Sequence, residues 1–281
     1  MGPPRAVARA AVVVAVAVVV VAAACSIGCS VDAREPPDMT LFLASVRDPA
    51  EAELALAASA DIVDLKDPGQ GALGALSPDA ISACVKSIAA RAPVSATIGD
   101  LPLNGDAVRA AVLATAALGV DYVKFGLFPD GDAARCLNQL KTAATRIRLI
   151  VVLFADALPG IDAVALAARI GAHGVMFDTM GKSAGSLPDH MSYMTLAGHI
   201  AAAKAEGLVV GLAGSLQARH VPSLLALAPD LLGFRGALCR AGDRAETLDE
   251  GRLASIRALI PERPRIWHEP DLADFAPQAL C

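Results

Sequence analysis

Ser59-Ala60-Asp61-Ile62-Val63-Asp64, Leu118-Gly119-Val120-Asp121-Tyr122-Val123 and Ile170-Gly171-Ala172-His173-Gly174-Val175 are three versions of one local pattern. In each version a helical stretch ends on small residues, and an apolar strand follows within two or three positions. Strands that are apolar on both faces must be covered on both faces, as in a parallel sheet with crossover helices. The pattern therefore predicts a repeated βα unit.

The same alternation continues from Met39 to Ile260 and predicts eight strands and eight helices. The expected strands are 41–46, 61–66, 94–98, 121–126, 149–154, 174–178, 208–214 and 230–235. The expected helices are 49–58, 78–90, 105–118, 132–145, 162–170, 189–206, 217–227 and 249–260. Eight such units match a TIM (β/α)8 barrel, which typically takes about 250 residues. A doubly wound open sheet is the alternative, but it requires a Gly-rich turn after the first strand, and none follows Val46.

The composition excludes several classes of protein. The 281 residues are 55% hydrophobic, with a mean hydropathy of +0.52 and a formal net charge of −5, which argues against disorder and nucleic-acid binding. After Met39 the four cysteines, Cys84, Cys136, Cys239 and Cys281, are scattered without metal-ligand spacing. We therefore expect no metal, no disulfide framework and a reducing compartment.

The N-terminal segment permits two interpretations. Residues 10–24 contain only Ala and Val, after Arg5 and Arg9 and before Cys25, which is typical of a signal peptide with a lipidated cysteine. In that case the protein is exported, and a lipid-anchored binding protein is an alternative function. In the other interpretation Met39 is the natural start and the protein is cytoplasmic, and we adopt it because the remaining chain resembles a metabolic enzyme. The expected divisions are a leader at 1–38, a barrel at 39–260 and an irregular tail at 261–281.

Lysines are scarce, so their positions are informative. Three of the six fall in expected helices, whereas Lys66 and Lys124 lie in apolar strands and Lys182 follows the strand that ends at Asp178. In a (β/α)8 barrel the reacting groups lie at the C-terminal ends of the strands. An ammonium group is costly in apolar surroundings unless it is paired or used, and unlike a guanidinium it can lose its proton and form a Schiff base. Lys66, Lys124 and Lys182 are therefore the candidate catalytic amines.

Carboxylates stand at the same strand ends. Asp64 precedes Lys66 by two positions, so both side chains point to one face, either as a salt bridge or as acid and base partners. Asp178 lies close to Lys182 and is the candidate general acid or base. Asp100 and Asp156 follow two further strands, where each either contacts substrate or holds loop backbone.

The last two strands point to an anion site. Gly214 and Ser215 follow the seventh strand, and Arg235 and Gly236 end the eighth. The loops at these two positions of a (β/α)8 barrel frequently bind phosphate through backbone N–H groups. We expect a small phosphorylated substrate there.

Seven ordered motifs between about residues 40 and 260 resemble one enzyme family. They are Asp61-Ile62-Val63-Asp64-Leu65-Lys66-Asp67-Pro68, Gly71-Ala72-Leu73-Gly74-Ala75, Ser95-Ala96-Thr97-Ile98-Gly99-Asp100, Asp121-Tyr122-Val123-Lys124, Asp178-Thr179 with Lys182, Gly211-Leu212-Ala213-Gly214-Ser215 and Arg235-Gly236-Ala237. The family is (5-formylfuran-3-yl)methyl phosphate synthase, also called 4-(hydroxymethyl)-2-furancarboxaldehyde-phosphate synthase.

The resemblance implies a TIM-barrel lyase that joins two molecules of glyceraldehyde 3-phosphate, with loss of one phosphate and two waters, for the biosynthesis of a methanofuran-type cofactor. It implies that Lys66 forms the Schiff base, that Lys124, Asp178 and Lys182 serve isomerisation and proton transfer, and that no cofactor or metal is needed. Archaeal members also carry a functional lysine at the start of the fifth strand, where this chain offers only Arg146 or Arg148. Another Schiff-base aldolase or a phosphosugar isomerase is the alternative activity, and assembly into a homo-oligomer stays open.

Overall fold

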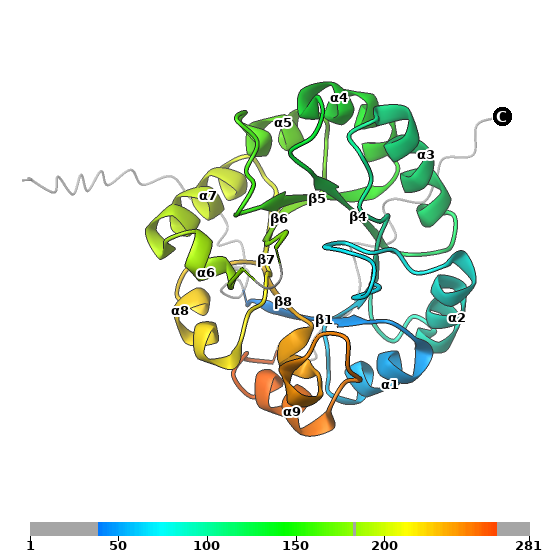
Figure 1. The fold of residues 1–281 in the computed structure, drawn as a ribbon, viewed down its shortest axis with the longest axis vertical. Coiled ribbons are helices and arrows are strands. Elements are labelled where there is room, and N and C mark those ends of the chain that lie inside the picture. The colour runs from blue at the N-terminus through cyan, green and yellow to red at the C-terminus, as the bar shows by residue number, and fades with distance from the viewer. Residues whose placement is uncertain (1–38, 182–183, 263–281) are drawn as a thin grey trace, which may run out of the picture. The chain divides into compact units, whose positions relative to one another are not determined.

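The computed structural model describes residues 39–181 and 184–262, and within them the chain forms a closed barrel of eight parallel strands ringed by helices (Figure 1). The strands follow one another around the barrel in chain order, and β8 pairs with β1 to close it. The predicted (β/α)8 fold is therefore confirmed.

The strands lie where the sequence predicts them, with small differences at their ends. They are β1 (Leu41–Val46), β2 (Ile62–Leu65), β3 (Val94–Thr97), β4 (Tyr122–Leu127), β5 (Arg148–Phe154), β6 (Gly174–Asp178), β7 (Val209–Leu212) and β8 (Leu231–Phe234). Both β1 and β6 have the predicted bounds. Most of the others are shorter, because residues such as Lys66 and Gly214 already belong to the loops after their strands.

The α-helices are α1 (Pro49–Ala57), α2 (Pro78–Ile88), α3 (Gly105–Ala116), α4 (Ala133–Ala144), α5 (Ala163–Arg169), α6 (Leu187–His190), α7 (Tyr193–Ala205), α8 (Val221–Leu225) and α9 (Glu250–Arg257). Several begin after an Asp, Ser or Asn whose side chain accepts a hydrogen bond from a first-turn N–H, as at Asp48 and Asp132. These side chains therefore act as N-caps.

Two of the predicted helices are not continuous α-helices. The helix expected over 189–206 is two helices, because Met191 is extended and the Ser192 hydroxyl caps α7 by accepting from the Thr195 N–H. The helix expected over 217–227 begins as a 3₁₀ turn, Ala218–His220, before α8. Short 3₁₀ turns, Gly236–Leu238 and Arg240–Gly242, also lie in the loop between β8 and α9, where none was expected.

The strands carry two separate apolar layers because their side chains alternate. One set, exemplified by Phe42, Val63 and Phe177, packs outward against the helices. The other set, exemplified by Ile62 and Met176, fills the inside of the barrel. Asp64 and Lys66 lie two and four positions after Ile62, so their side chains also face the inside of the barrel, nearer the C-terminal end of the strands.

The repeated αβ joint has a specific structural role at the N-terminal end of the barrel. The Asp61 carboxylate accepts from the Phe42 N–H at 2.7 Å, and Asp121 accepts from the Val94 N–H at the same distance. Asp230, directly before β8, accepts from the Val210 N–H at 2.6 Å. Each aspartate thus binds the beginning of the preceding strand in the chain.

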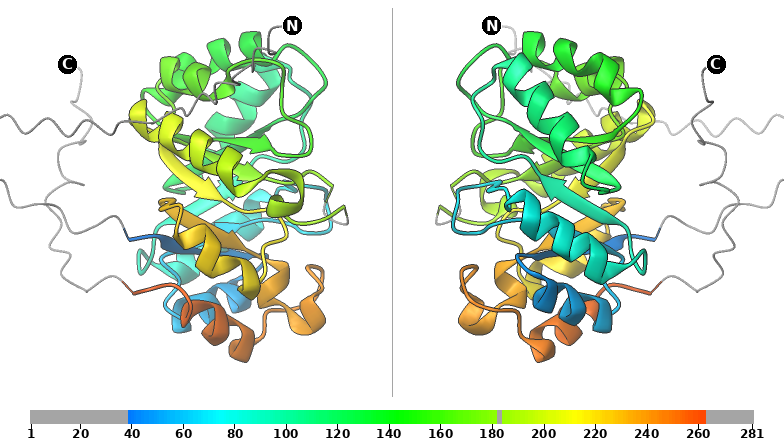
Figure 2. Two further views of the ribbon diagram at one scale, coloured as in Figure 1. Left: turned by 90° about the vertical axis from the view of Figure 1, so that its left-hand side faces the viewer. Right: turned by 90° about the vertical axis from the view of Figure 1, so that its right-hand side faces the viewer.

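The loops after β2, β6 and β8 project from one end of the barrel, and β1 begins at the other end (Figure 2). Within the described residues no helix combines the length and the apolarity needed to span a bilayer. The loops at the first end surround the cavity described next.

Candidate active site

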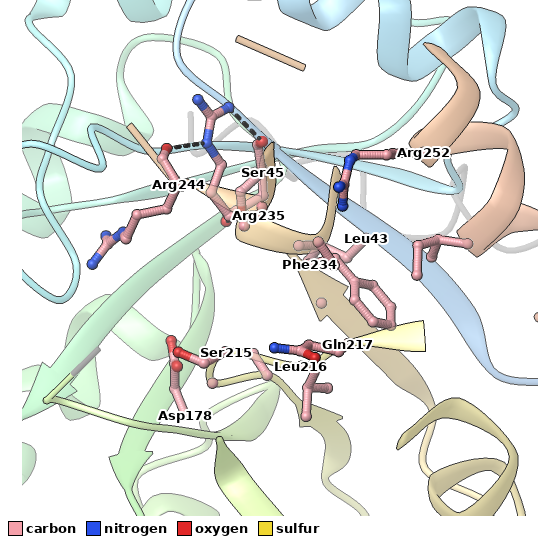
Figure 3. A pocket seen from close by; sticks show the side chains of 18 of the residues that line it. Leu43, Ser45, Asp178, Ser215, Leu216, Gln217, Phe234, Arg235, Arg244 and Arg252 are labelled. Atoms are coloured by element: carbon pink, nitrogen blue, oxygen red, sulfur yellow. Dashed lines mark hydrogen bonds between the residues drawn. The ribbon is translucent and has the colours of Figure 1, made fainter. Parts of the chain in front are cut away.

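A cavity of about 750 Å³ opens at the C-terminal end of the barrel (Figure 3). The predicted residues that line it are Asp64, Lys66, Lys124, Asp178, Gly214, Ser215, Arg235 and Gly236. Lys182 lies outside the described residues. Asp100 does not line the cavity. The barrel thus brings eight of the ten predicted site residues to one cavity.

Asp64 and Lys124 form a buried ion pair at the floor of the cavity. The Lys124 Nζ lies 2.5 Å from the Asp64 Oδ1, and both side chains are almost inaccessible to solvent. The strand register places Ser45 and Ser95 beside Asp64, and both hydroxyls donate to its carboxylate, at 2.8 and 2.6 Å. Every one of these contacts comes from a different strand, so no local sequence spacing determines it.

The surroundings of Asp64 keep its carboxyl ionised. Burial alone would raise its pKa, but the positive charges of Lys124 and Lys66 and the hydrogen bonds from Lys124 and Ser95 together lower it. An ionised Asp64 in turn compensates the charge of Lys124. Asp64 therefore forms a salt bridge, but its partner is Lys124 and not Lys66.

Lys66 and Asp178 face each other across the barrel mouth. The Lys66 Nζ lies 3.7 Å from the Asp178 Oδ2, and both residues are buried. The other Asp178 oxygen accepts from the Thr179 N–H at 2.7 Å, which fixes the orientation of the carboxylate. A carboxylate held beside a buried amine in a cavity is an arrangement suited to proton transfer at a carbon bound to that amine.

Asp100 and Asp156 hold loops instead of facing the cavity. Asp100 accepts from the N–H groups of Ala72 and Leu73, at 2.7 and 2.6 Å. Asp156 accepts from Met180 and Gly181 in the same manner, at 2.8 and 2.7 Å. Burial would raise the Asp156 pKa, but these backbone hydrogen bonds outweigh it and lower the pKa. Both side chains therefore take the loop-holding alternative, which shapes the loops after Lys66 and Asp178.

Arg235 lines the cavity, but its guanidinium is used inside the protein. It pairs with the buried Glu51 of α1 at 2.5 Å and donates to the backbone oxygens of Ser45, Arg244 and Glu246. Together with a second hydrogen bond to Glu51, these contacts use all five of its N–H groups. The guanidinium has no donor left for a phosphate, so its observed contacts are those of an anchor for the β8–α9 loop.

Gly214 and Ser215 form a sharp turn after β7. Gly214 has a φ of +97°, and a Cβ there would lie 2.8 Å from the Thr179 N, so a side chain is excluded. Ser215 is also left-handed, with a φ of 48°. The turn brings the backbone of these residues next to Asp178, at the wall of the cavity opposite Arg235 (Figure 3).

Sequence reasoning missed three cavity-lining arginines. Arg219 follows the Gly214 turn, Arg244 lies in the β8–α9 loop, and Arg252 lies in α9. No strand or glycine motif marks them, and their one sequence signal is a basic residue in the segments that follow the last two strands. With them the cavity holds both amines and guanidinium groups, which is a suitable lining for a phosphorylated ligand.

Neither Arg146 nor Arg148 lines the cavity. Arg148 begins β5 at the opposite end of the barrel, and its guanidinium lies 5.6 Å from the centre of the Tyr122 ring. Arg146 is exposed ahead of the strand. Within the described residues, no group of three or more His, Cys, Asp or Glu side chains is arranged to hold a metal ion.

Comparison with known proteins identifies relatives along most of the chain. Residues 42–257 match the family model described as 4-HFC-P synthase. A (5-formylfuran-3-yl)methyl phosphate synthase of Methanocaldococcus jannaschii is 32% identical over 79% of this chain and 97% of its own length. A Methylorubrum extorquens protein that carries the same synthase name provisionally is 44% identical over 80% of this chain and 93% of its own.

Solved structures with the same fold are more distant in sequence. Phosphoribosyl anthranilate isomerase from Thermotoga maritima has a TM-score of 0.59 at 11% identity, over 78% of this chain and 97% of its own. A 3-hexulose-6-phosphate synthase from Salmonella typhimurium has a TM-score of 0.56 at 16% identity, over 78% and 98%. At such identities these likenesses concern the fold alone.

Proposed function

The chain belongs to the 4-HFC-P synthase family, and on this premise we propose that it condenses two molecules of glyceraldehyde 3-phosphate into 4-(hydroxymethyl)-2-furancarboxaldehyde phosphate. One phosphate and two waters leave in the overall reaction. The product would serve the biosynthesis of a methanofuran-type cofactor. A cytoplasmic location and homo-oligomeric assembly stay predictions from the sequence.

The pairing of Lys66 with Asp178 inside the cavity is the observation that carries the proposal. In the proposed mechanism the neutral Lys66 amine adds to the carbonyl carbon of one triose, and water leaves as the C=N bond forms. The iminium then withdraws electrons from the neighbouring carbon, so a proton there becomes acidic. Asp178 is the proposed acceptor of that proton, and its carboxylate lies 3.7 Å from the Lys66 Nζ.

The resulting enamine carbon attacks the carbonyl of the second triose, and the new alkoxide takes a proton. Lys124 is the candidate donor, because it lines the same cavity and its Nζ is held 2.5 Å from the Asp64 Oδ1. Elimination of phosphate and water then needs further proton transfers, for which Asp178 and Lys124 are both within the cavity. Addition of water to the C=N bond finally releases the product and restores the Lys66 amine. Lys182 is proposed for proton transfer on the strength of the family resemblance.

Incubation of the purified protein with glyceraldehyde 3-phosphate alone tests this function. We expect mass spectrometry to show a furan aldehyde phosphate and one equivalent of inorganic phosphate. Borohydride reduction during turnover should leave an adduct on the Lys66 peptide. Lys66→Arg should lose both the product and the adduct, since a guanidinium does not form an imine.

Lys86→Arg is the matched control, because Lys86 is an exposed lysine of α2 outside the cavity. It should keep full activity. A protein that forms an adduct on Lys66 with a different sugar phosphate, but no furan from the triose, would instead be an aldolase or isomerase. Normal turnover by Lys66→Arg would exclude the Schiff-base mechanism.

A further inference from the structure

The loop between β8 and α9 carries two arginines that differ in how many of their N–H donors are used within the protein. All five N–H groups of Arg235 are used by Glu51 and by backbone oxygens. Within the described residues the Arg244 guanidinium donates a single hydrogen bond, from its Nη2 to the Gly71 oxygen at 3.1 Å. Gly71 belongs to the loop that follows Lys66. The Arg244 side chain therefore bridges two loops over the mouth of the cavity and keeps most of its donors available.

Among the described residues, the Arg244 guanidinium has no carboxylate in contact with it. Its side chain is partly buried, and no carboxylate of the described chain lies within 4 Å of it. Burial lowers its pKa, and the nearby charge of Arg235 lowers it further, while Asp178, Asp100 and Asp67 act in the opposite direction. Partial burial of a guanidinium without a carboxylate costs free energy, and a bound anion would offset that cost.

The backbone of Arg244 is held by the anchor described above. The Arg235 Nε donates to the Arg244 oxygen at 2.9 Å, and its Nη2 donates to the Glu246 oxygen at 2.8 Å. Figure 3 shows the Arg244 side chain leaving this anchor on the side of the cavity opposite Arg252. Glu51, Arg235 and Arg244 thus form a chain of contacts that ends in a guanidinium facing the cavity.

We propose that Arg244 binds the phosphate of a triose phosphate at the Gly71 side of the cavity, and that Arg235 and Glu51 position it there. Guanidinium groups bind phosphate oxygens in a two-pronged manner through Nε and Nη2 or through Nη1 and Nη2. The Gly71 oxygen takes one of the two N–H groups of the Arg244 Nη2, so the other remains to form such a pair with Nε or Nη1. The condensation of two trioses requires two anion subsites, and Arg244 and Arg252 lie on opposite sides. The inference rests on the proposed function for the identity of the substrate.

Competition between two aldehydes tests the role of Arg244. Glyceraldehyde 3-phosphate and glyceraldehyde differ by the phosphate, and borohydride traps either one on Lys66. In the unchanged protein we expect strong preference for the phosphorylated aldehyde. Arg244→Gln should lower the ratio of trapping rates by about 10- to 100-fold, and should leave trapping of glyceraldehyde unchanged. Arg244→Lys should restore part of the preference, since it keeps a point charge.

Arg240→Gln is the matched control, because Arg240 is an exposed arginine of the same loop that does not line the cavity. Arg240→Gln should keep the ratio of the two trapping rates unchanged. Arg235→Lys tests the positioning role and should lower the ratio without changing glyceraldehyde trapping. If Arg244→Gln keeps the same ratio of trapping rates as the unchanged protein, the inference is wrong. If the unchanged protein shows no trapping on Lys66 at all, the proposed function is wrong instead.

Discussion

At the scale of single residues, the cavity depends on charge compensation between side chains of different strands. The Asp64 carboxylate contacts Lys124 of β4, Ser45 of β1 and Ser95 of β3, while Lys66, just after the strand of Asp64, faces Asp178. Two amines therefore share one end of the barrel with two carboxylates, but in different pairs. This separation gives Lys66 a neighbour suited to proton transfer and gives Lys124 a permanent counter-ion.

Asp64→Asn tests this compensation. It leaves the buried Lys124 without a carboxylate, so we expect the free energy of unfolding to fall by about 3 kcal/mol at neutral pH. The folded-state pKa of Asp64 lies below its ordinary value, so its contribution is present above about pH 4 and is lost as the pH falls through the lowered pKa. The difference from the unchanged protein should therefore narrow at acidic pH.

Urea denaturation at neutral pH and below about pH 4 measures this difference. Asp130→Asn is the control, because Asp130 is exposed in the β4–α4 loop. An equal gap between Asp64→Asn and the unchanged protein at both pH values would show that the carboxylate charge is not responsible.

At the scale of elements, the repeated αβ joint has a purely structural task. The joint ends a helix with a left-handed residue, such as Gly119 or Gly171, and the joints at 59–64 and 118–123 then place an aspartate that binds the preceding strand. In the third version His173 takes the aspartate's place, and its backbone N–H donates to the Leu149 oxygen. The repeat thus fixes how neighbouring βα units meet at the end of the barrel away from the cavity.

Asp121→Ala should remove one such connection. The Val94 N–H loses its acceptor, so we expect a loss of about 1 to 2 kcal/mol in the free energy of unfolding, with unchanged activity because the site is at the other end. Asp121→Asn keeps an acceptor oxygen and should retain most of the stability. Thermal unfolding and the furan assay measure both effects, and a large loss of activity in a stably folded Asp121→Ala would contradict this division of roles.

At the scale of the whole molecule, ion pairs close the barrel at both of its ends. Arg235 after β8 pairs with Glu51 of α1 at the cavity end, and Arg257 of α9 pairs with Asp61 before β2 at 2.8 Å at the other end. Arg257 also lies 5.4 Å from the centre of the Phe42 ring and donates to the Ser59 and Ile260 oxygens. The last βα unit is therefore joined to the first by contacts far apart in the sequence.

Arg257→Met should weaken the closure without touching the cavity. We expect a loss of about 2 kcal/mol in the free energy of unfolding, less than for a fully buried pair because Asp61 is partly exposed. The kcat of the furan assay should stay unchanged. Arg109→Met, at an exposed arginine of α3, is the control and should change neither quantity. Equal stability of the two variants would show that the Arg257 contacts contribute nothing to the closure.

The sequence by itself determined the order of strands and helices, the closed barrel, and the end of the barrel at which the lysines and aspartates gather. These follow from periodicity and from small-residue joints, which are local properties of the chain. Asp64 and Lys66 both line the cavity because they are two residues apart, near the end of β2 and just after it, and this spacing is sufficient to predict a shared face. The break at Met191 and Ser192 escaped prediction, because a cap there competes with an otherwise continuous helical pattern.

The tertiary structure alone decided which groups pair. Lys124 reaches Asp64 through strand register, Arg235 turns to Glu51, and Arg244 is held over the cavity from a loop without a motif. Asp100 and Asp156 bind loop amides and leave the cavity to other side chains. Such partners lie tens to nearly two hundred residues apart in the chain, and their meeting depends on how the barrel closes, which no local pattern encodes.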